Sequence, residues 1–296
     1  MTGYTVWMLV HPPRRTYATA LARGIPGDPG EVGPDGGGPY VFESWETELG
    51  QGRGGLKVWD VGGKDAQGPV VVFVHGWGDS RIGGLSRLPV FAGIASRVLM
   101  FDLRGHGESG GTCGLGVRDV GDLGAVVARI GGERPIVLVG WSMGAGVAIA
   151  FAASGLGVSG RVAAVIAESA YRFGSTPARN VLRMSRLPYR INLPLAFACL
   201  GVEHRLGLRG FDGPRFDRAA LASRLKVPLL VIHGLDDRTS PPADGKLIAQ
   251  AAPNGEFLGV ADAGHHGLWT KPETGLLVGK ASADFVARQV RSRMPV

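Results

Sequence analysis

Ser142 lies in a short motif that could supply a nucleophile. Residues 140–144 read Gly-Trp-Ser-Met-Gly and separate an unbroken apolar run from an alanine- and glycine-rich stretch typical of a helix. Glycines two positions on either side of a serine allow a sharp strand-to-helix turn that exposes the hydroxyl, and the helix amino terminus favours negative charge beside it. Because the chain has 49 glycines, the prediction of a nucleophilic serine rests on this position between strand and helix.

Further motifs resemble those of the α/β-hydrolase fold superfamily. Residues 75–78, His-Gly-Trp-Gly, follow a predicted strand, as does the segment that completes the oxyanion hole in that family. Residues 101–109, Phe-Asp-Leu-Arg-Gly-His-Gly-Glu-Ser, are similar to the loop after the next strand in many members. The resemblance covers residue 40 to the C-terminus, and the motifs occur in the family's order. It implies an α/β fold: a mostly parallel sheet of about eight strands, helices on both faces and a helical cap insertion.

A serine hydroxyl needs a neighbouring base, and that base needs a carboxylate to orient it. In this family the acid and then the base follow the serine along the chain. After the apolar run 228–232 the sequence resembles the family's acid turn, G-x-x-D followed four residues later by proline, and counting from Gly234 indicates Asp237. After the last predicted strand, residues 263–266, Ala-Gly-His-His, resemble the family's glycine-histidine turn and indicate His265 as the base.

Other residues remain candidates for these two roles. Asp236 is an alternative acid one position earlier, and Glu168 ends a predicted strand where some lipases of this fold keep their acid, although the Glu-Ser pair also resembles a structural feature of the family. His266 is the rival base. The remaining histidines of the loop motifs are expected to be hydrogen-bonded turn residues: His75, His106 and His233. Asp102 and Arg104 are expected to pair with each other and stiffen their loop.

The resemblance implies acyl transfer to water. Ser142 would attack a carbonyl, His265 would take the proton and return it to the leaving group, and Asp237 would fix the imidazole tautomer. The backbone amides of Trp77 and Met143 would form the oxyanion hole, worth roughly 3 kcal/mol per donor. No metal or organic cofactor is needed, and no nucleotide-binding fingerprint occurs in the right context. Relatives that open epoxides or displace halide use aspartate at the elbow, so Ser142 favours ester, thioester or amide hydrolysis.

A sheet must position these residues, and hydrophobic patterns locate its strands. Strands are predicted at 40–49, 56–61, 70–74, 97–101, 135–139, 163–167, 228–232 and 256–260. The clearest helices are predicted at 117–130, 143–153, 243–252 and 272–293. Unbroken apolar strands that alternate with helices are typical of a parallel sheet covered on both faces.

The chain divides into an irregular N-terminal extension, 1–39, and a hydrolase domain, 40–296, with a cap insertion at about 170–226. About sixty residues separate two predicted strands around the cap, where roughly two to six are usual, so the interval must hold its own structure. It contains eleven basic residues against three acidic ones, while the rest of the chain is nearly neutral. Its apolar stretch 191–200 could line an acyl pocket or simply pack the cap on the core, and its arginines could attract anions or form a solvated face.

Composition excludes several classes of protein. With 296 residues and 45% hydrophobic content, the chain can bury a full core, so disorder and a small stapled scaffold are excluded. Cys113 and Cys199 make neither a disulfide framework nor a zinc site, which favours a reducing compartment. The first apolar run is too short to span a membrane and lacks a signal peptide's flanks. We therefore expect a cytoplasmic protein without a nucleic-acid partner or stable membrane insertion.

Three hypotheses follow for function. The first is a cofactor-independent serine hydrolase that cleaves small-molecule carboxylic esters with water. The second is a serine peptidase, aminopeptidase or thioesterase of the same fold, in which Glu168 or Glu203 would hold a substrate amine; the positive cap opposes that. The third is a non-catalytic ligand-binding protein on a hydrolase scaffold, since a fold alone does not determine function. The complete set of Ser142, Asp237 and His265 opposes the third. No motif indicates an oligomeric state.

Overall fold

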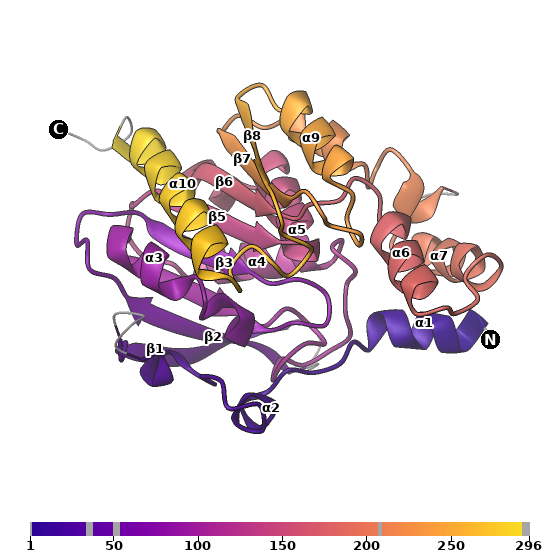
Figure 1. Ribbon diagram of the computed structural model, residues 1–296, viewed down its shortest axis with the longest axis horizontal. Helices are drawn as coiled ribbons and strands as arrows, with labels where there is room; N and C mark the ends of the chain where they lie inside the picture. The colour runs from indigo at the N-terminus through magenta and orange to yellow at the C-terminus, as the bar shows by residue number, and fades with distance from the viewer. Residues whose placement is uncertain (1, 34–37, 50–53, 207–208, 292–296) are drawn as a thin grey trace.

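The computed structural model describes residues 2–33, 38–49, 54–206 and 209–291. At its centre lies an eight-stranded sheet with the strand order β1-β2-β4-β3-β5-β6-β7-β8 (Figure 1). The strands are β1 (Phe42–Glu48), β2 (Gly55–Gly62), β3 (Val70–Val74), β4 (Arg97–Phe101), β5 (Ile136–Trp141), β6 (Val162–Glu168), β7 (Leu229–Gly234) and β8 (Gly255–Val260). β2 is antiparallel to β1 and β4, and all other pairs are parallel. The expected mostly parallel sheet is confirmed.

Helices cover both faces of this sheet (Figure 1). They are α1 (Thr2–Val10), α2 (Tyr17–Leu21), α3 (Leu88–Ile94), α4 (Asp119–Ala128), α5 (Met143–Ala153), α6 (Ser175–Met184), α7 (Asn192–Glu203), α8 (Arg218–Ala222), α9 (Pro242–Ala251) and α10 (Pro272–Arg291). The expectation of an irregular segment over 1–39 was wrong for α1 and α2. Because α1 has only nine residues, its stability must come from packing rather than from a helix signal in the sequence.

The alternation of side chains along β3 shows how the two layers form. Val70, Val72 and Val74 belong to the core cluster that includes α4, α5, α8 and α9. Val71 and Phe73 point to the opposite face and join the cluster that includes α3 and α10. A strand buried on both faces must be apolar throughout, which explains the unbroken hydrophobic run in the sequence. The central strands β3, β5 and β6 are therefore enclosed on both faces.

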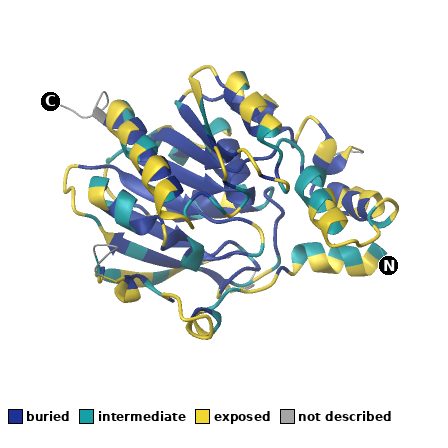
Figure 2. Ribbon diagram, viewed as in Figure 1, coloured by how far each residue is buried: buried dark blue, intermediate teal, exposed yellow. Residues whose placement is uncertain are grey.

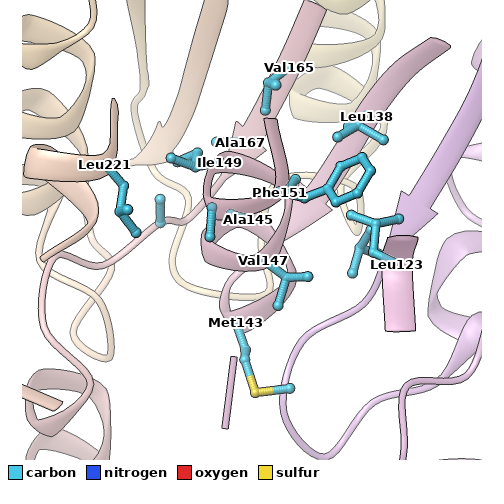
Figure 3. Packing of buried hydrophobic residues seen from close by; sticks show 14 of the residues in the cluster. Leu123, Leu138, Met143, Ala145, Val147, Ile149, Phe151, Val165, Ala167 and Leu221 are labelled. Atoms are coloured by element: carbon cyan, nitrogen blue, oxygen red, sulfur yellow. The ribbon is translucent and has the colours of Figure 1, made fainter. Parts of the chain in front are cut away.

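Helix α5 is buried along most of its length. Figure 3 shows Phe151 of this helix beside Leu123 of α4 and Leu138 of β5 in one apolar cluster. The small residues of α5 let its backbone approach β5 and β6, with which it makes extensive contact. This packing holds the amino terminus of α5 directly after the carboxyl end of β5, where Ser142 lies.

Between β6 and β7 the chain forms α6, α7 and α8, and α1 packs against α7 at the same end of the molecule (Figure 1). Of these peripheral helices, α1, α6 and α7 are more exposed than the sheet (Figure 2), whereas most residues of α8 are buried. Cys199 is exposed on α7, whereas Cys113 is buried and its burial raises the pKa of its thiol. Over the described ranges, no helix combines the length and apolar character needed to cross a bilayer.

Candidate active site

Ser142 occupies a strained turn between β5 and α5. Its backbone has φ 55° and ψ −114°, a region that residues other than glycine rarely adopt. Two hydrogen bonds hold the turn: the Ser142 amide donates to the Glu168 carbonyl at 2.8 Å, and the Ala145 amide donates to the Ser142 carbonyl at 3.1 Å. The first ties the turn to the end of β6 and the second begins the helix, so the serine is fixed from both sides.

The two glycines of the motif are required by close packing. A Cβ at Gly140 would collide with the carbonyl of Gly144 and the backbone of Ala145. A Cβ at Gly144 would collide with the carbonyls of Val74 and His75, at the end of β3. Glycine at both positions therefore lets α5 begin against the sheet, as the sequence motif indicated.

The structure brings His265 to Ser142. His265 Nε2 lies 3.0 Å from Ser142 Oγ, and its Nδ1 lies 2.7 Å from Asp237 Oδ2. Asp237 follows β7, and His265 lies in the turn after β8, so both meet the serine at the carboxyl edge of the sheet. The indole of Trp141 donates to the His265 carbonyl at 3.2 Å and helps to hold that turn. These distances suit proton transfer from the hydroxyl to the imidazole.

The alternative acids and base are not in this hydrogen-bonded chain. Asp236 is exposed, whereas its neighbour Asp237 is 4% exposed and accepts the hydrogen bond from the imidazole. His266 packs its ring 5.0 Å from the ring of Trp141, and burial lowers its pKa. Glu168 is fully buried and engaged elsewhere. The described contacts therefore favour the residues that the family motifs indicated.

Several donors surround the carboxylate of Asp237. Burial alone would raise its pKa, but hydrogen bonds from His233 and His265 outweigh burial and hold that pKa well below its ordinary value. The amides of Thr239 and Ser240 also donate to its Oδ1, at 2.9 and 2.8 Å. The carboxylate is thus ionised and fixed, as a group that orients and stabilises an imidazolium must be.

Two of the other loop histidines, His75 and His106, are hydrogen-bonded within their turns. The Leu103 amide donates to His75 Nε2 at 2.9 Å, so the proton of the ring lies on Nδ1, which donates to the Gly76 carbonyl at 2.7 Å. His106 Nδ1 lies 3.0 Å from the Arg104 carbonyl. Burial lowers the pKa of His75 to about 4 and that of His106 to about 3, so both rings are neutral near pH 7.

The expected pairing of Asp102 with Arg104 was wrong. Arg104 forms an ion pair with Asp122 of α4 instead. Asp102 accepts hydrogen bonds from the backbone amides of Arg81 and Glu108, at 2.7 and 2.9 Å. A carboxylate two residues from an arginine can turn inward to backbone donors while the longer arginine reaches another element, and spacing alone does not distinguish these outcomes.

The segment expected to complete the oxyanion hole runs beside Ser142. A Cβ placed on Gly76 would lie 3.1 Å from Ser142 Cβ, so the backbone of residues 75–77 passes next to the serine. Met143 is the first residue of α5, and amides in the first turn of a helix have no acceptor within it. Trp77 and Met143 both line the cavity that contains Ser142.

This cavity has a volume of about 530 Å³ and is mainly apolar. It is lined by Ser142, His265 and Trp77 together with residues of α1, α6 and α7. None of the described residues that line it is aspartate, glutamate, lysine or arginine. In the described part of the chain, no group of three or more His, Cys, Asp or Glu side chains is arranged to hold a metal ion.

Behind the serine, Glu168 joins two residues that the sequence did not single out. Arg87, which precedes α3, donates from Nε and Nη2 to Glu168 Oε2 at 2.9 and 2.6 Å. Trp269 donates from its indole to Glu168 Oε1 at 2.8 Å. The only signal in the sequence was a carboxylate at the end of an unbroken apolar strand, which must find a buried cation or donor. Glu168 therefore stabilises the edge on which Ser142 and the His265 turn lie.

Comparison with known proteins shows the family. A profile described as the alpha/beta hydrolase family matches residues 71–276. The chain therefore belongs to the alpha/beta hydrolase family, and the membership expected from the motifs is confirmed.

Individual relatives share less than a third of their aligned residues with this chain. A Mycobacterium tuberculosis protein, BpoC, which carries the name of a non-heme bromoperoxidase, is 28% identical over 237 residues, covering 70% of this chain and 90% of that protein. Human protein phosphatase methylesterase 1 is 31% identical over 124 residues, 39% of this chain and 31% of that protein. The Pyrococcus furiosus esterase Pf2001 superposes with a TM-score of 0.69 and 20% identity, covering 95% of this chain and all of that one, which shows the shared fold.

Proposed function

We propose that this protein is a cofactor-independent serine hydrolase that cleaves carboxylic esters through an acyl-enzyme intermediate. The observation that supports it is the continuous hydrogen-bonded chain from Ser142 Oγ through the His265 imidazole to Asp237, with 3.0 and 2.7 Å between the atoms. Names of relatives that include an esterase and a methylesterase agree with ester cleavage. Membership of a hydrolase family makes an enzyme the expected class.

In the proposed mechanism, Ser142 Oγ attacks the ester carbonyl carbon while its proton passes to His265 Nε2. The negative charge on the carbonyl oxygen is stabilised by the amides of Met143 and Trp77. Collapse of this intermediate breaks the bond to the alcohol, which leaves with the proton from His265. Water then attacks the acyl-serine and loses a proton to His265; collapse of this second intermediate breaks the bond to Ser142 Oγ, which takes the proton back from His265, and the acid departs. Throughout, Asp237 holds the imidazole tautomer and stabilises its cationic form.

The lining of the cavity disfavours an aminopeptidase. Such an enzyme needs a carboxylate near the nucleophile to hold the substrate amine, and the two that the sequence offered are engaged. Glu168 pairs with Arg87, and Glu203 lies 3.6 Å from Arg118. Three arginines of the cap, Arg179, Arg190 and Arg209, line a second hollow of about 430 Å³ that does not include Ser142. An uncharged ester therefore suits the cavity better than an amine or an anion.

Replacement of the serine tests this proposal. We expect the purified protein to hydrolyse p-nitrophenyl acetate and butyrate, and Ser142→Ala to lower turnover by about a thousandfold or more. The matched control is Ser169→Ala: Ser169 is buried after β6, and its hydroxyl has no hydrogen-bond partner among the described residues. A fluorophosphonate probe should label the wild type and Ser169→Ala but not Ser142→Ala. Full activity in Ser142→Ala would contradict the assignment.

A further inference from the structure

The N-terminal helix forms a wall of the cavity that contains Ser142. Tyr4, Thr5, Met8 and Leu9 of α1 line it together with Ser142 and His265. Val6, Leu9 and Val10 pack against the main core cluster, while Trp7 is 54% exposed and does not line the cavity. Helix α1 therefore presents one face to the cavity and the core and another to the surroundings.

Contacts at the carboxyl end of α1 and just beyond it hold this helix in place. The indole of Trp77 donates to the Leu9 carbonyl at 2.9 Å, and the Cys113 amide donates to the Val10 carbonyl at 2.9 Å. Just beyond the helix, Arg14 donates to the Ser109 carbonyl at 2.7 Å, and Arg15 pairs with Asp79 at 2.9 Å. Trp77 is thus bonded to α1 through its side chain while its backbone runs beside Ser142.

Helix α6 also lines this cavity. Pro177, Ala178, Val181 and Leu182 all line the cavity. Together with Met8 and Leu9 they give the cavity an apolar lining that comes from two helices. Its volume of about 530 Å³ falls within the roughly 300–1,000 Å³ typical of sites for small molecules. A mainly apolar cavity, with no Asp, Glu, Lys or Arg among the described residues of its lining, binds a hydrocarbon chain better than a polar or charged group.

We infer that α1 and α6 form a binding subsite for the linear apolar chain of an ester, so that the preferred substrates carry a chain several methylenes longer than acetate. This inference rests on the proposed function, because it assumes that the ester carbonyl lies at Ser142. The subsite depends on α1, because four residues of this helix belong to the lining: Tyr4, Thr5, Met8 and Leu9. The hydrocarbon chain can belong to the acyl part or to the alcohol part of the ester.

Two substrate series show whether the acyl part or the alcohol part of the ester supplies the hydrocarbon chain. p-Nitrophenyl esters from acetate to octanoate vary the acyl chain, and acetates of ethanol to octanol vary the alcohol. A buried methylene contributes about fourfold to kcat/KM, so four further buried methylenes raise it on the order of a hundredfold. A rise of this size in either series supports the subsite and identifies which part of the ester occupies it. Flat profiles in both series overturn it.

Variants on α1 and α6 test where the subsite lies. Met8→Trp fills the cavity and should lower kcat/KM for the octyl substrate at least tenfold, while acetate changes by less than threefold. Trp7→Ala, on the neighbouring residue outside the cavity, should leave the chain-length profile unchanged. Val181→Trp tests the wall on α6 independently, in case a change in α1 affects folding. Equal profiles for all three variants and the wild type would contradict the assignment of α1 and α6.

A binding measurement separates this inference from the proposed function. Calorimetric titration of Ser142→Ala with 1-octanol tests the subsite without turnover. Binding that is weakened at least fivefold when Met8→Trp is added, but not when Trp7→Ala is added, supports the subsite even if no ester is hydrolysed. Lack of binding overturns the subsite. If acetate is hydrolysed and the fluorophosphonate labels Ser142 while octanol does not bind, only the proposed function survives.

Discussion

Two consecutive carboxylates at the end of β7 have opposite surroundings. Asp237 is 4% exposed and receives hydrogen bonds from His265 and from the Thr239 and Ser240 amides. Asp236 is exposed in the same turn. The turn orients one side chain towards the imidazole and the other away, so a shift of one residue separates a buried, ionised acid from a surface residue. Substitution of each in turn therefore provides a matched pair.

We predict that Asp237→Asn lowers kcat for p-nitrophenyl butyrate by about a thousandfold to ten-thousandfold, since the amide cannot hold the imidazole in the tautomer that accepts the serine proton. Asp236→Asn should keep kcat within about twofold, as a change at an exposed position does. Steady-state kinetics of the two variants at pH 7.5 provide the measurement. A retained rate in Asp237→Asn, or an equal loss in both, would show that the acid lies elsewhere.

Strands β3 and β4 lead into loops that form a buried polar layer. The rings of His75, after β3, and His106, after β4, lie 5.0 Å apart, and both residues are fully buried. Burial disfavours their charged forms, which is why the pKa of each is lowered. The pKa of Asp102 beside them is raised by burial to about 6. The two rings and the Asp102 carboxyl are therefore all neutral between about pH 4 and 6, whereas above pH 6 the Asp102 carboxylate is charged and lies 3.8 Å from the Arg81 guanidinium.

This layer makes the free energy of unfolding depend on pH. The folded pKa of His75 is about 4 against a reference value of 6.5, so between these values the unfolded chain binds a proton that the folded chain does not. Stability is then lost as pH falls from 6.5 to 4, by about 3 kcal/mol for this residue. Asp102 acts in the opposite direction, because its raised pKa favours the folded state at low pH.

Urea unfolding of the wild type and His75→Gln between pH 7 and 4 isolates the histidine. We expect the variant to lose about 3 kcal/mol less than the wild type over this range, because glutamine does not titrate. Both proteins should be insensitive to this group between pH 7 and 8. Parallel stability curves across the whole range would contradict a neutral, buried His75.

The strands could be predicted from the sequence more fully than the short helices. All eight strands were predicted with nearly correct bounds, because strands buried on both faces are continuous apolar runs between turn residues. The serine turn was predicted because a side chain at either of its glycines would collide with nearby backbone, so the motif is visible in the sequence. Helices α3, α6, α7 and α8 were not placed, since short helices are stabilised mainly by their neighbours. The contacts of Arg87, Trp269 and α1 depend on segments distant in the chain, so no local pattern could indicate them.

Across the whole molecule, the ion pair of Glu168 and Arg87 links three separate parts of the chain. It joins the end of β6 to the start of α3, and the indole of Trp269 adds the loop that precedes α10. Both charged groups are buried, with 0% and 10% of their side chains exposed. Removal of one charge from such a pair leaves the other buried without compensation, which is costly. This link therefore contributes to cooperative folding of the sheet with its C-terminal helix.

We predict that Glu168→Gln lowers the free energy of unfolding by about 3 kcal/mol or more, because the guanidinium of Arg87 keeps its charge without a counterion. Asp284→Asn is the control: it breaks the pair of Lys280 and Asp284 on α10, whose side chains are 77% and 54% exposed, and should cost less than about 1 kcal/mol. Urea denaturation monitored by tryptophan fluorescence measures both. Equal losses in the two variants would contradict a structural role for the buried pair.

The different surroundings of Cys113 and Cys199 have a practical consequence. Alkylation and maleimide addition require a thiolate that the reagent can reach, and only the sulfur on α7 is exposed, whereas the other is buried with a raised pKa. The native sequence thus offers one selective attachment point, on a helix that packs against α1. An environment-sensitive fluorophore placed there would report in real time when a hydrocarbon ligand enters between the peripheral helices, without any engineered cysteine.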